Sequence, residues 1–191
     1  MKPQETFELN GYTVNIIYDS DAESPSKNSD DEERRICFLT TTNNRYFVVR
    51  VDGFNPEDLE DEERLAEVEK THHVYPLYAY IHSGVALSLG RSGQFSCPWD
   101  SGRIGSVFIT KDTSEITEPE KCAEGLVEQW NQYLSGDVWG YEIEDPDGVH
   151  VDSCCGFYGL EYCKEEARNA VPDVTPVPLT TLSQSCVGAG I

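Results

Sequence analysis

The sequence predicts an α+β protein, an antiparallel sheet built from hairpins with about three helices packed on one side. Strand-like segments occur in pairs separated by short turn sequences, and three stretches carry the caps or the residue spacing of helices. Strands that follow one another as hairpins form antiparallel sheets, to which helices add a second layer. We expect a single domain over residues 1–170, with an acidic part at 1–70 and a core at 71–170, and a flexible tail at 171–191.

The hairpins are identified from their turns. Asn10-Gly11 separates two strands that end near Tyr18, and Asn-Gly is a strong signal for a two-residue hairpin turn. Three more strand pairs are expected, namely 36–42 with 45–51, 78–82 with 85–89, and 138–144 with 149–154. Residues 104–110 complete the set as one further strand.

The helices are identified from their ends. Asn55-Pro56-Glu57-Asp58 offers a cap residue, a proline at the first position and acid in the first turn, so a helix is expected from there to Glu69. Thr117-Glu118-Pro119-Glu120 has the form of a capping box, and the helix after it should stop at Gly136. A third helix is expected at about 160–170.

The composition is that of a globular protein, with 38% hydrophobic and 10% aromatic residues among 191. No apolar run approaches the roughly 20 residues that span a bilayer, and the start lacks the apolar core of a signal peptide. We therefore expect a cytoplasmic protein, in the host cell cytoplasm if it is viral. Its seven cysteines are an odd number without a regular framework, which favours free thiols in a reducing compartment.

The charge is strongly negative and unevenly distributed. The formal net charge is −21 at pH 7. Residues 1–70 hold 18 acidic and 8 basic residues, residues 117–170 hold 13 and 3, and residues 71–116 hold three of each. Such a protein repels nucleic acid and anionic membranes and attracts basic protein surfaces. We expect no direct nucleic-acid or membrane binding.

Carboxylates on two of the expected helices are the leading candidates for a partner-binding surface. DNA-binding proteins present Lys and Arg clusters, and acidic side chains on rigid helices can compete for those clusters. The candidates are Glu57, Asp58, Asp61, Glu62, Glu120, Glu124 and Glu128. Trp99 and Asp100 would add a rigid anchor in a tight Trp-Asp-Ser-Gly turn, in which Trp99 can also simply be buried. The bland alternative is an acidic surface that only maintains solubility.

A cysteine nucleophile is the second candidate site. Cys97 follows a Gly/Ser loop, His82 lies fifteen residues earlier, and Asp100 or Asp152 could orient an imidazole. A thiol activated by a neighbouring histidine is the basis of cysteine-dependent catalysis. The alternative is that Cys97 is a turn or core residue and that His82 satisfies a buried backbone group.

A metal site is weakly supported. Cys154, Cys155 and Cys163 could supply ligands together with Cys97, His82 or His150, but the metal-binding spacings Cys-x-x-Cys and His-x-x-x-His do not occur. We therefore expect neither a metal nor another cofactor.

Three runs resemble an uncharacterised group of small acidic proteins carried by phages, viruses and plasmids. They are His82 to Ser88 followed by Cys97-Pro98-Trp99-Asp100-Ser101-Gly102, Gln132 to Tyr141, and Val151 to Gly159 with its Gly-Phe-Tyr-Gly motif. The likeness covers about residues 75–168. It implies a mobile-element setting, in which small acidic cytoplasmic proteins often block restriction or CRISPR complexes. It implies no catalytic residues.

Three functional hypotheses follow. The leading one is a non-enzymatic inhibitor, of the anti-restriction or anti-CRISPR kind, that binds a basic nucleic-acid-handling host protein through acidic and DNA-mimicking helices. The runner-up is a cysteine-dependent hydrolase or transferase that uses Cys97, His82 and Asp100 or Asp152. The third is a structural protein whose acidity serves solubility. A homodimer stays open, since the sequence alone identifies no exposed apolar stripe.

Overall fold

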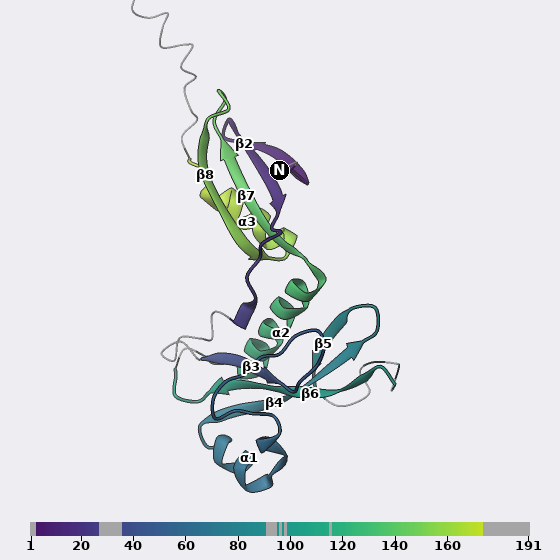
Figure 1. Ribbon diagram of the computed structural model, residues 1–191. Coiled ribbons are helices and arrows are strands. Elements are labelled where there is room, and N and C mark those ends of the chain that lie inside the picture. Colours follow the sequence, from purple (N-terminus) through teal and green to yellow (C-terminus); the bar gives the residue numbers. More distant parts are fainter. Residues whose placement is uncertain are drawn as a thin grey trace, which may run out of the picture. The chain divides into compact units, whose positions relative to one another are not determined.

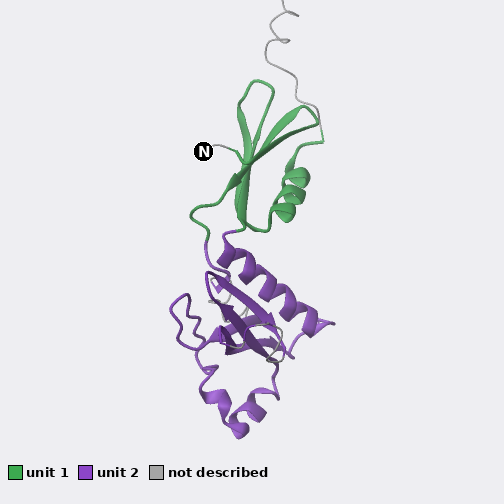
Figure 2. Cartoon of the chain, turned by 90° about the vertical axis from the view of Figure 1, so that its right-hand side faces the viewer, with its two compact units in different colours: residues 1–22, 137–191 green, residues 23–136 purple. Residues whose placement is uncertain are grey.

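The computed structural model describes residues 3–26, 36–90, 95, 97, 99–114 and 116–173. The chain forms two compact units, unit 1 from residues 1–22 and 137–191 and unit 2 from residues 23–136 (Figure 2). Each unit contains a four-stranded antiparallel sheet, and the described residues also form three α-helices, so the α+β class is confirmed. We expected one sheet and there are two, because the first hairpin pairs with the last one and closes a compact unit of its own.

Unit 1 brings together the two ends of the described chain. Its strands are β1 (Glu5–Leu9), β2 (Tyr12–Tyr18), β7 (Val138–Glu144) and β8 (His150–Tyr158), in that spatial order. The predicted turn is confirmed, since Asn10 and Gly11 have φ of 54° and 84°, as a type I′ turn requires. Helix α3 (Leu160–Ala170) packs its buried Cys163 and Ala167 against Val14 and Ile143. The predicted tail lies, from residue 174 on, outside the described residues.

Unit 2 is built on a sheet in the order β3-β6-β4-β5. Its elements are β3 (Cys37–Thr41), the 3-10 helix η3 (Asp58–Glu60), α1 (Glu62–Val68), β4 (His72–Ile81), β5 (Val85–Leu89), β6 (Ser101–Thr110) and α2 (Pro119–Ser135). β3 and β5 are the edge strands. The described helices include none with the length and apolar character needed to cross a bilayer.

Helices cover both faces of the unit 2 sheet. Successive residues of a strand point to opposite faces. Leu39 and Val107 pack with Val127 of α2, whereas their neighbours Phe38 and Phe108 pack with residues of η3 and α1. α2 and α1 therefore lie on opposite sides of one sheet (Figure 1), and not on a single side as we expected.

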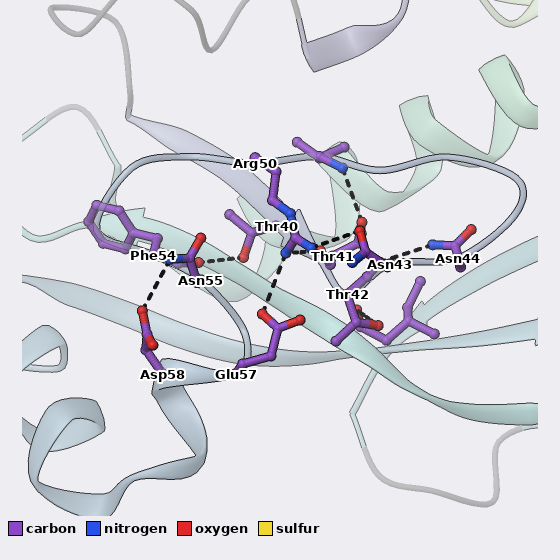
Figure 3. A network of polar contacts seen from close by, with 12 residues as sticks. Thr40, Thr41, Thr42, Asn43, Asn44, Arg50, Phe54, Asn55, Glu57 and Asp58 are labelled. Carbon is purple, nitrogen blue, oxygen red and sulfur yellow. Dashed lines mark hydrogen bonds and ion pairs between the residues drawn. The ribbon is translucent and has the colours of Figure 1, made fainter.

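The expected strand at 45–51 does not form. Val49 O accepts from the Thr41 N–H at 3.1 Å, and Val51 O accepts from the Phe54 N–H at 3.0 Å. The Val49 N–H, however, donates to the Thr41 hydroxyl at 3.1 Å, and other side chains supply further bonds (Figure 3). Arg50 donates to Thr41 O and to Asn43 Oδ1, both at 2.9 Å, and the buried Thr40 hydroxyl donates to Phe54 O at 2.8 Å. The side-chain bonds satisfy backbone groups that a strand ladder would otherwise pair, so the segment stays irregular.

Two helix starts differ from the sequence prediction. The expected helix from Asn55 to Glu69 is divided into η3 and α1, and Asp61 caps α1 by accepting from the Arg64 N–H at 2.9 Å. For α2 the capping box is wrong, since Glu118 is the N-cap residue and no side chain caps that end. The end of α2 is confirmed, because Gly136 takes the left-handed conformation with φ of 78°.

Candidate functional site

The three residues proposed as nucleophile, base and orienter lie together at one end of the unit 2 sheet. His82 follows β4, Asp100 precedes β6, and the Ile81 N–H donates to Asp100 O at 2.7 Å. The pairing of β4 with β6 thus brings His82 and Asp100 side by side although the chain separates them by a whole hairpin. Cys97 is held nearby, since the Ser101 hydroxyl donates to Cys97 O at 2.7 Å.

Asp100 is the centre of this cluster. Its Oδ2 accepts from the Cys97 thiol at 3.3 Å and lies 3.5 Å from His82 Nδ1. Within the described residues Cys97 and His82 form no hydrogen bond with each other. In a cysteine–histidine pair the imidazole must receive the thiol proton, and here the carboxylate occupies that place. The other proposed orienter, Asp152, belongs to unit 1, where it accepts from the Tyr141 hydroxyl at 3.4 Å.

Trp99 projects into solvent beside this cluster. Its exposed fraction is 93%, so the interpretation of Trp99 as a buried turn residue is wrong. The neighbouring rings are ordered among themselves. Tyr80 stacks on Phe95 and on His82, with ring centroids 5.8 and 6.3 Å apart, and the Tyr46 hydroxyl donates to His82 O at 3.4 Å. An exposed indole next to an ordered aromatic group is a common feature of binding surfaces.

The candidate carboxylates fall into two groups on opposite sides of the sheet. Those of η3 and α1 already serve the fold: Glu57 pairs with Arg50 at 3.5 Å, Asp58 accepts from Asn55, and Asp61 caps α1, while Glu62 is exposed. Those of α2 are exposed, and none forms an ion pair or hydrogen bond with a described residue. We call Glu120, Glu124 and Glu128 the α2 acidic row.

The N-terminal half of α2 borders an open hollow of about 620 Å³. It is lined by His73 and Tyr75 of β4 and by Glu118, Pro119, Glu120, Lys121 and Glu124. Lys121 pairs with Glu118 at 2.6 Å, which leaves the two carboxylates of the α2 acidic row facing an aromatic ring. Burial, the Glu120 charge and Cys122 raise the pKa of Tyr75. Carboxylates around an aromatic ring suit a Lys or Arg side chain.

The cysteines proposed as metal ligands do not assemble. Cys154 and Cys155 are exposed on β8 and Cys163 is buried on α3, where burial, followed by Cys155 and Cys154, raises its pKa to about 12. Over the described part of the chain, no three or more His, Cys, Asp or Glu side chains are arranged to hold a metal ion. His82 and Cys97 belong to the other unit.

Two side-chain groups were not identified from the sequence. Cys37 and Cys122 are neighbours across the β3–α2 interface, and the His72 ring packs edge-on against Phe38, Phe54 and Phe108. Neither involves a motif or a regular spacing, so only the folded arrangement reveals them.

Comparisons with protein-family models, with curated proteins and with solved structures find no match to this chain. The resemblance to proteins of mobile elements therefore stays a prediction. The functional inference depends on the chemistry of the described side chains.

Proposed function

We propose that this protein is a non-enzymatic inhibitor that acts in the cytoplasm and binds a basic surface of a host defence protein or another nucleic-acid-handling protein. The α2 acidic row forms the contact. The observation that carries the proposal is the contrast between the two groups of candidate carboxylates. Glu57, Asp58 and Asp61 have partners or cap a helix within the fold, whereas the α2 acidic row has no ion pair or hydrogen bond among the described residues.

Free carboxylates at the surface are available to a partner without breaking an existing pair. Glu120, Glu124 and Glu128 recur every four residues, so they stand in one exposed row along α2, beside the face that its buried Ala123, Val127 and Trp130 form. The sheet and the buried face hold the helix in place, so a partner need not order it. A pre-ordered row lowers the entropy cost of binding.

The row matches DNA in sign more than in charge density. Four residues of helix rise about 6 Å, so the row presents one charge per roughly 6 Å, compared with one per roughly 1.7 Å of duplex axis. We therefore propose that the row contacts a local cluster of Lys and Arg side chains on the partner. One of these side chains would bind in the hollow beside Tyr75.

Trp99 is proposed as a second contact. Interface energy concentrates in a few residues, among which tryptophan is enriched, and the 93% exposed Trp99 has a large apolar area to bury. The next residue, Asp100, contacts both Cys97 and His82, and these contacts hold the backbone beside Trp99 in place.

The test begins with capture of partners from host lysate on the purified protein, followed by washes at low and at high salt. The captured protein is then purified, and its affinity is measured for two matched triple variants. One variant carries Glu120→Gln, Glu124→Gln and Glu128→Gln on α2. The other carries Glu62→Gln, Glu63→Gln and Glu69→Gln on the α1 side, where all three residues are exposed. Both lose the same charge.

We expect the α2 variant to bind roughly 3- to 150-fold more weakly, since three exposed ion pairs at roughly 0.2–1 kcal/mol each sum to about 0.6–3 kcal/mol. The α1-side variant should stay within about twofold of wild type, because under the proposal its three residues do not contact the partner. Equal losses in both variants would mean that net charge alone attracts the partner. Capture of nothing at low salt would favour an acidic surface that serves solubility.

A cysteine-dependent hydrolase or transferase is the second candidate, favoured by the convergence of Cys97 and His82 on one oxygen of Asp100. For catalysis the His82 ring, whose side chain is 67% exposed, must turn from Asp100 to the Cys97 thiol. Under this hypothesis Cys97→Ser abolishes turnover of a thioester or ester substrate panel. Under the inhibitor hypothesis Cys97→Ser leaves partner binding unchanged. Alkylation of Cys97 that is no faster than that of a free thiol would contradict the enzyme.

A further inference from the structure

We propose that Cys37 and Cys122 form a redox-reactive pair, which a low-molecular-weight disulfide such as oxidised glutathione converts into an intramolecular disulfide between β3 and α2. Cys37 pairs with Ile109 near the end of β6, whereas Asp100 precedes the start of that strand, so the pair lies away from the His82–Asp100 cluster. The inference does not depend on the proposed function.

The two cysteines come from different layers of unit 2. Cys37 is the first residue of β3, and Cys122 lies in the first turns of α2. The Cys37 thiol donates to Cys122 O at 3.8 Å, and the Cys122 side chain is also within hydrogen-bonding reach of it. The pairing of β3 with β6 and the burial of Leu39 against α2 hold both residues in place. Two cysteines whose thiols meet in this way have side chains that lie close to each other, as a disulfide requires.

A cavity of about 320 Å³ borders both cysteines, and each of them is only partly buried. Cys37 and Cys122 line it together with apolar side chains such as Leu126 and Trp130. The cavity lies between the sheet and α2, so a small disulfide can enter where a protein cannot. Access distinguishes this pair from Cys163, which is fully buried on α3.

The exchange balances in two steps. The Cys122 thiolate attacks one sulfur of oxidised glutathione, which forms a mixed disulfide and releases one glutathione thiolate. The Cys37 thiolate then attacks the Cys122 sulfur, forms the protein disulfide and releases the second glutathione. The two cysteines lose two electrons and two protons in total, and oxidised glutathione is reduced to two glutathione molecules.

The burial of Cys37 limits the rate of the second step of this reaction. Burial, followed by the neighbouring Cys122, raises the pKa of the Cys37 thiol. Only a small fraction is thiolate at neutral pH, so the closing step is slow and accelerates as the pH rises. The pair therefore stays reduced in a reducing compartment and responds to sustained oxidation.

The experiment uses the full chain. The protein is incubated with oxidised and reduced glutathione at defined ratios, quenched with acid and N-ethylmaleimide, and mapped by mass spectrometry without reduction. We expect a linked peptide pair that contains Cys37 and Cys122 as the main intramolecular product. Thermal unfolding of the oxidised protein should move up by about 5–15 °C, because the bridge closes a long loop, and dithiothreitol should reverse the shift.

Matched variants show whether Cys37 and Cys122 cause the shift of the unfolding midpoint. Cys122→Ser and Cys37→Ala should each abolish the linked peptide and the shift of the unfolding midpoint. The double variant Cys154→Ser, Cys155→Ser should keep both, since these residues belong to unit 1. Oxidation that leaves Cys37 and Cys122 alkylatable, or that stops at glutathione attached to Cys122, would overturn the proposal in the wild-type protein itself, whatever the variants do.

Discussion

Asn131 of α2 pairs with the backbone of Leu87 as if it were a neighbouring strand. Its amide donates to Leu87 O at 3.0 Å, and its carbonyl oxygen accepts from the Leu87 N–H at 2.7 Å. β5 is an edge strand, so these two groups would otherwise face outward unpaired. One polar side chain thus closes part of the sheet edge and fixes α2, with its acidic row, relative to β5.

The first prediction concerns this pairing. Asn131→Asp removes the donor and places a carboxylate against Leu87 O, so we expect the free energy of unfolding to fall by about 1–3 kcal/mol. Urea denaturation followed by circular dichroism measures it. Gln129→Glu is the matched control, since the same amide-to-acid change occurs at an exposed position of the same helix. Equal stability of the two variants would show that the hydrogen bonds between Asn131 and Leu87 do not stabilise the fold.

A second prediction concerns close contact between β6 and β3. A Cβ atom on Gly105 would lie far inside van der Waals contact with Thr40 O and 3.0 Å from the Thr41 Cα. Because both are backbone atoms of a paired strand, Gly105→Ala should cost at least about 1–3 kcal/mol of unfolding free energy. In the same strand Gly102 has open space around it, so Gly102→Ala should change stability by less than about 0.5 kcal/mol. Chemical denaturation of both variants compares them.

A third prediction concerns pH. Burial, followed by the Lys111 charge, lowers the pKa of His72 below its ordinary 6.5, and its ring packs against Phe38 and Phe108. The unfolded chain then binds more protons than the folded one near and below pH 6.5, so the stability that the neutral ring provides is lost as the pH falls through this range.

Urea denaturation at a series of pH values measures this effect against His72→Gln, which has no titrating ring. The wild-type free energy of unfolding should fall relative to that of the variant as the pH drops below about 6.5. Two curves that stay parallel would contradict a shifted His72 pKa.

A fourth prediction separates binding from stability at Trp99. The side chain is 93% exposed, so Trp99→Ala should change the unfolding free energy by less than about 0.5 kcal/mol. If Trp99 anchors the partner, affinity should fall at least about tenfold, as for a hot-spot residue. Trp130→Ala is the opposite case. Because Trp130 is buried in the core of unit 2, its replacement should lower the unfolding free energy rather than remove a contact with the partner. Isothermal titration and denaturation measure the two effects.

Local signals were readable from the sequence where neighbouring residues decide the structure. The Asn10-Gly11 turn and the Gly136 C-cap each depend on backbone conformations that only a few residue types adopt, and both are confirmed. The strand expected at 45–51 failed for a tertiary reason, since the Arg50 side chain bonds Thr41 O and the buried Thr41 hydroxyl bonds the Val49 N–H in place of a strand ladder.

In the candidate site, too, the sequence identified the residues and the tertiary structure decided their arrangement. His82, Cys97 and Asp100 were picked for their chemistry, but their order, with the carboxylate in the middle, follows from the register between β4 and β6. The carboxylates of α1 and α2 are alike in sequence. Partners such as Arg50, which reaches Glu57 from a distant loop, decide which of them are free.

By itself the sequence determined the fold class, the Asn10-Gly11 turn, most helix and strand positions, and the acidity on which the proposed function rests, because these depend on composition and on residues close along the chain. Only the tertiary structure decided the division into two units, the placement of α1 and α2 on opposite faces of one sheet, and the meeting of Cys37 with Cys122. Those features depend on which strands pair across long separations, and strand pairing is set by packing of the whole unit rather than by any local run of residues.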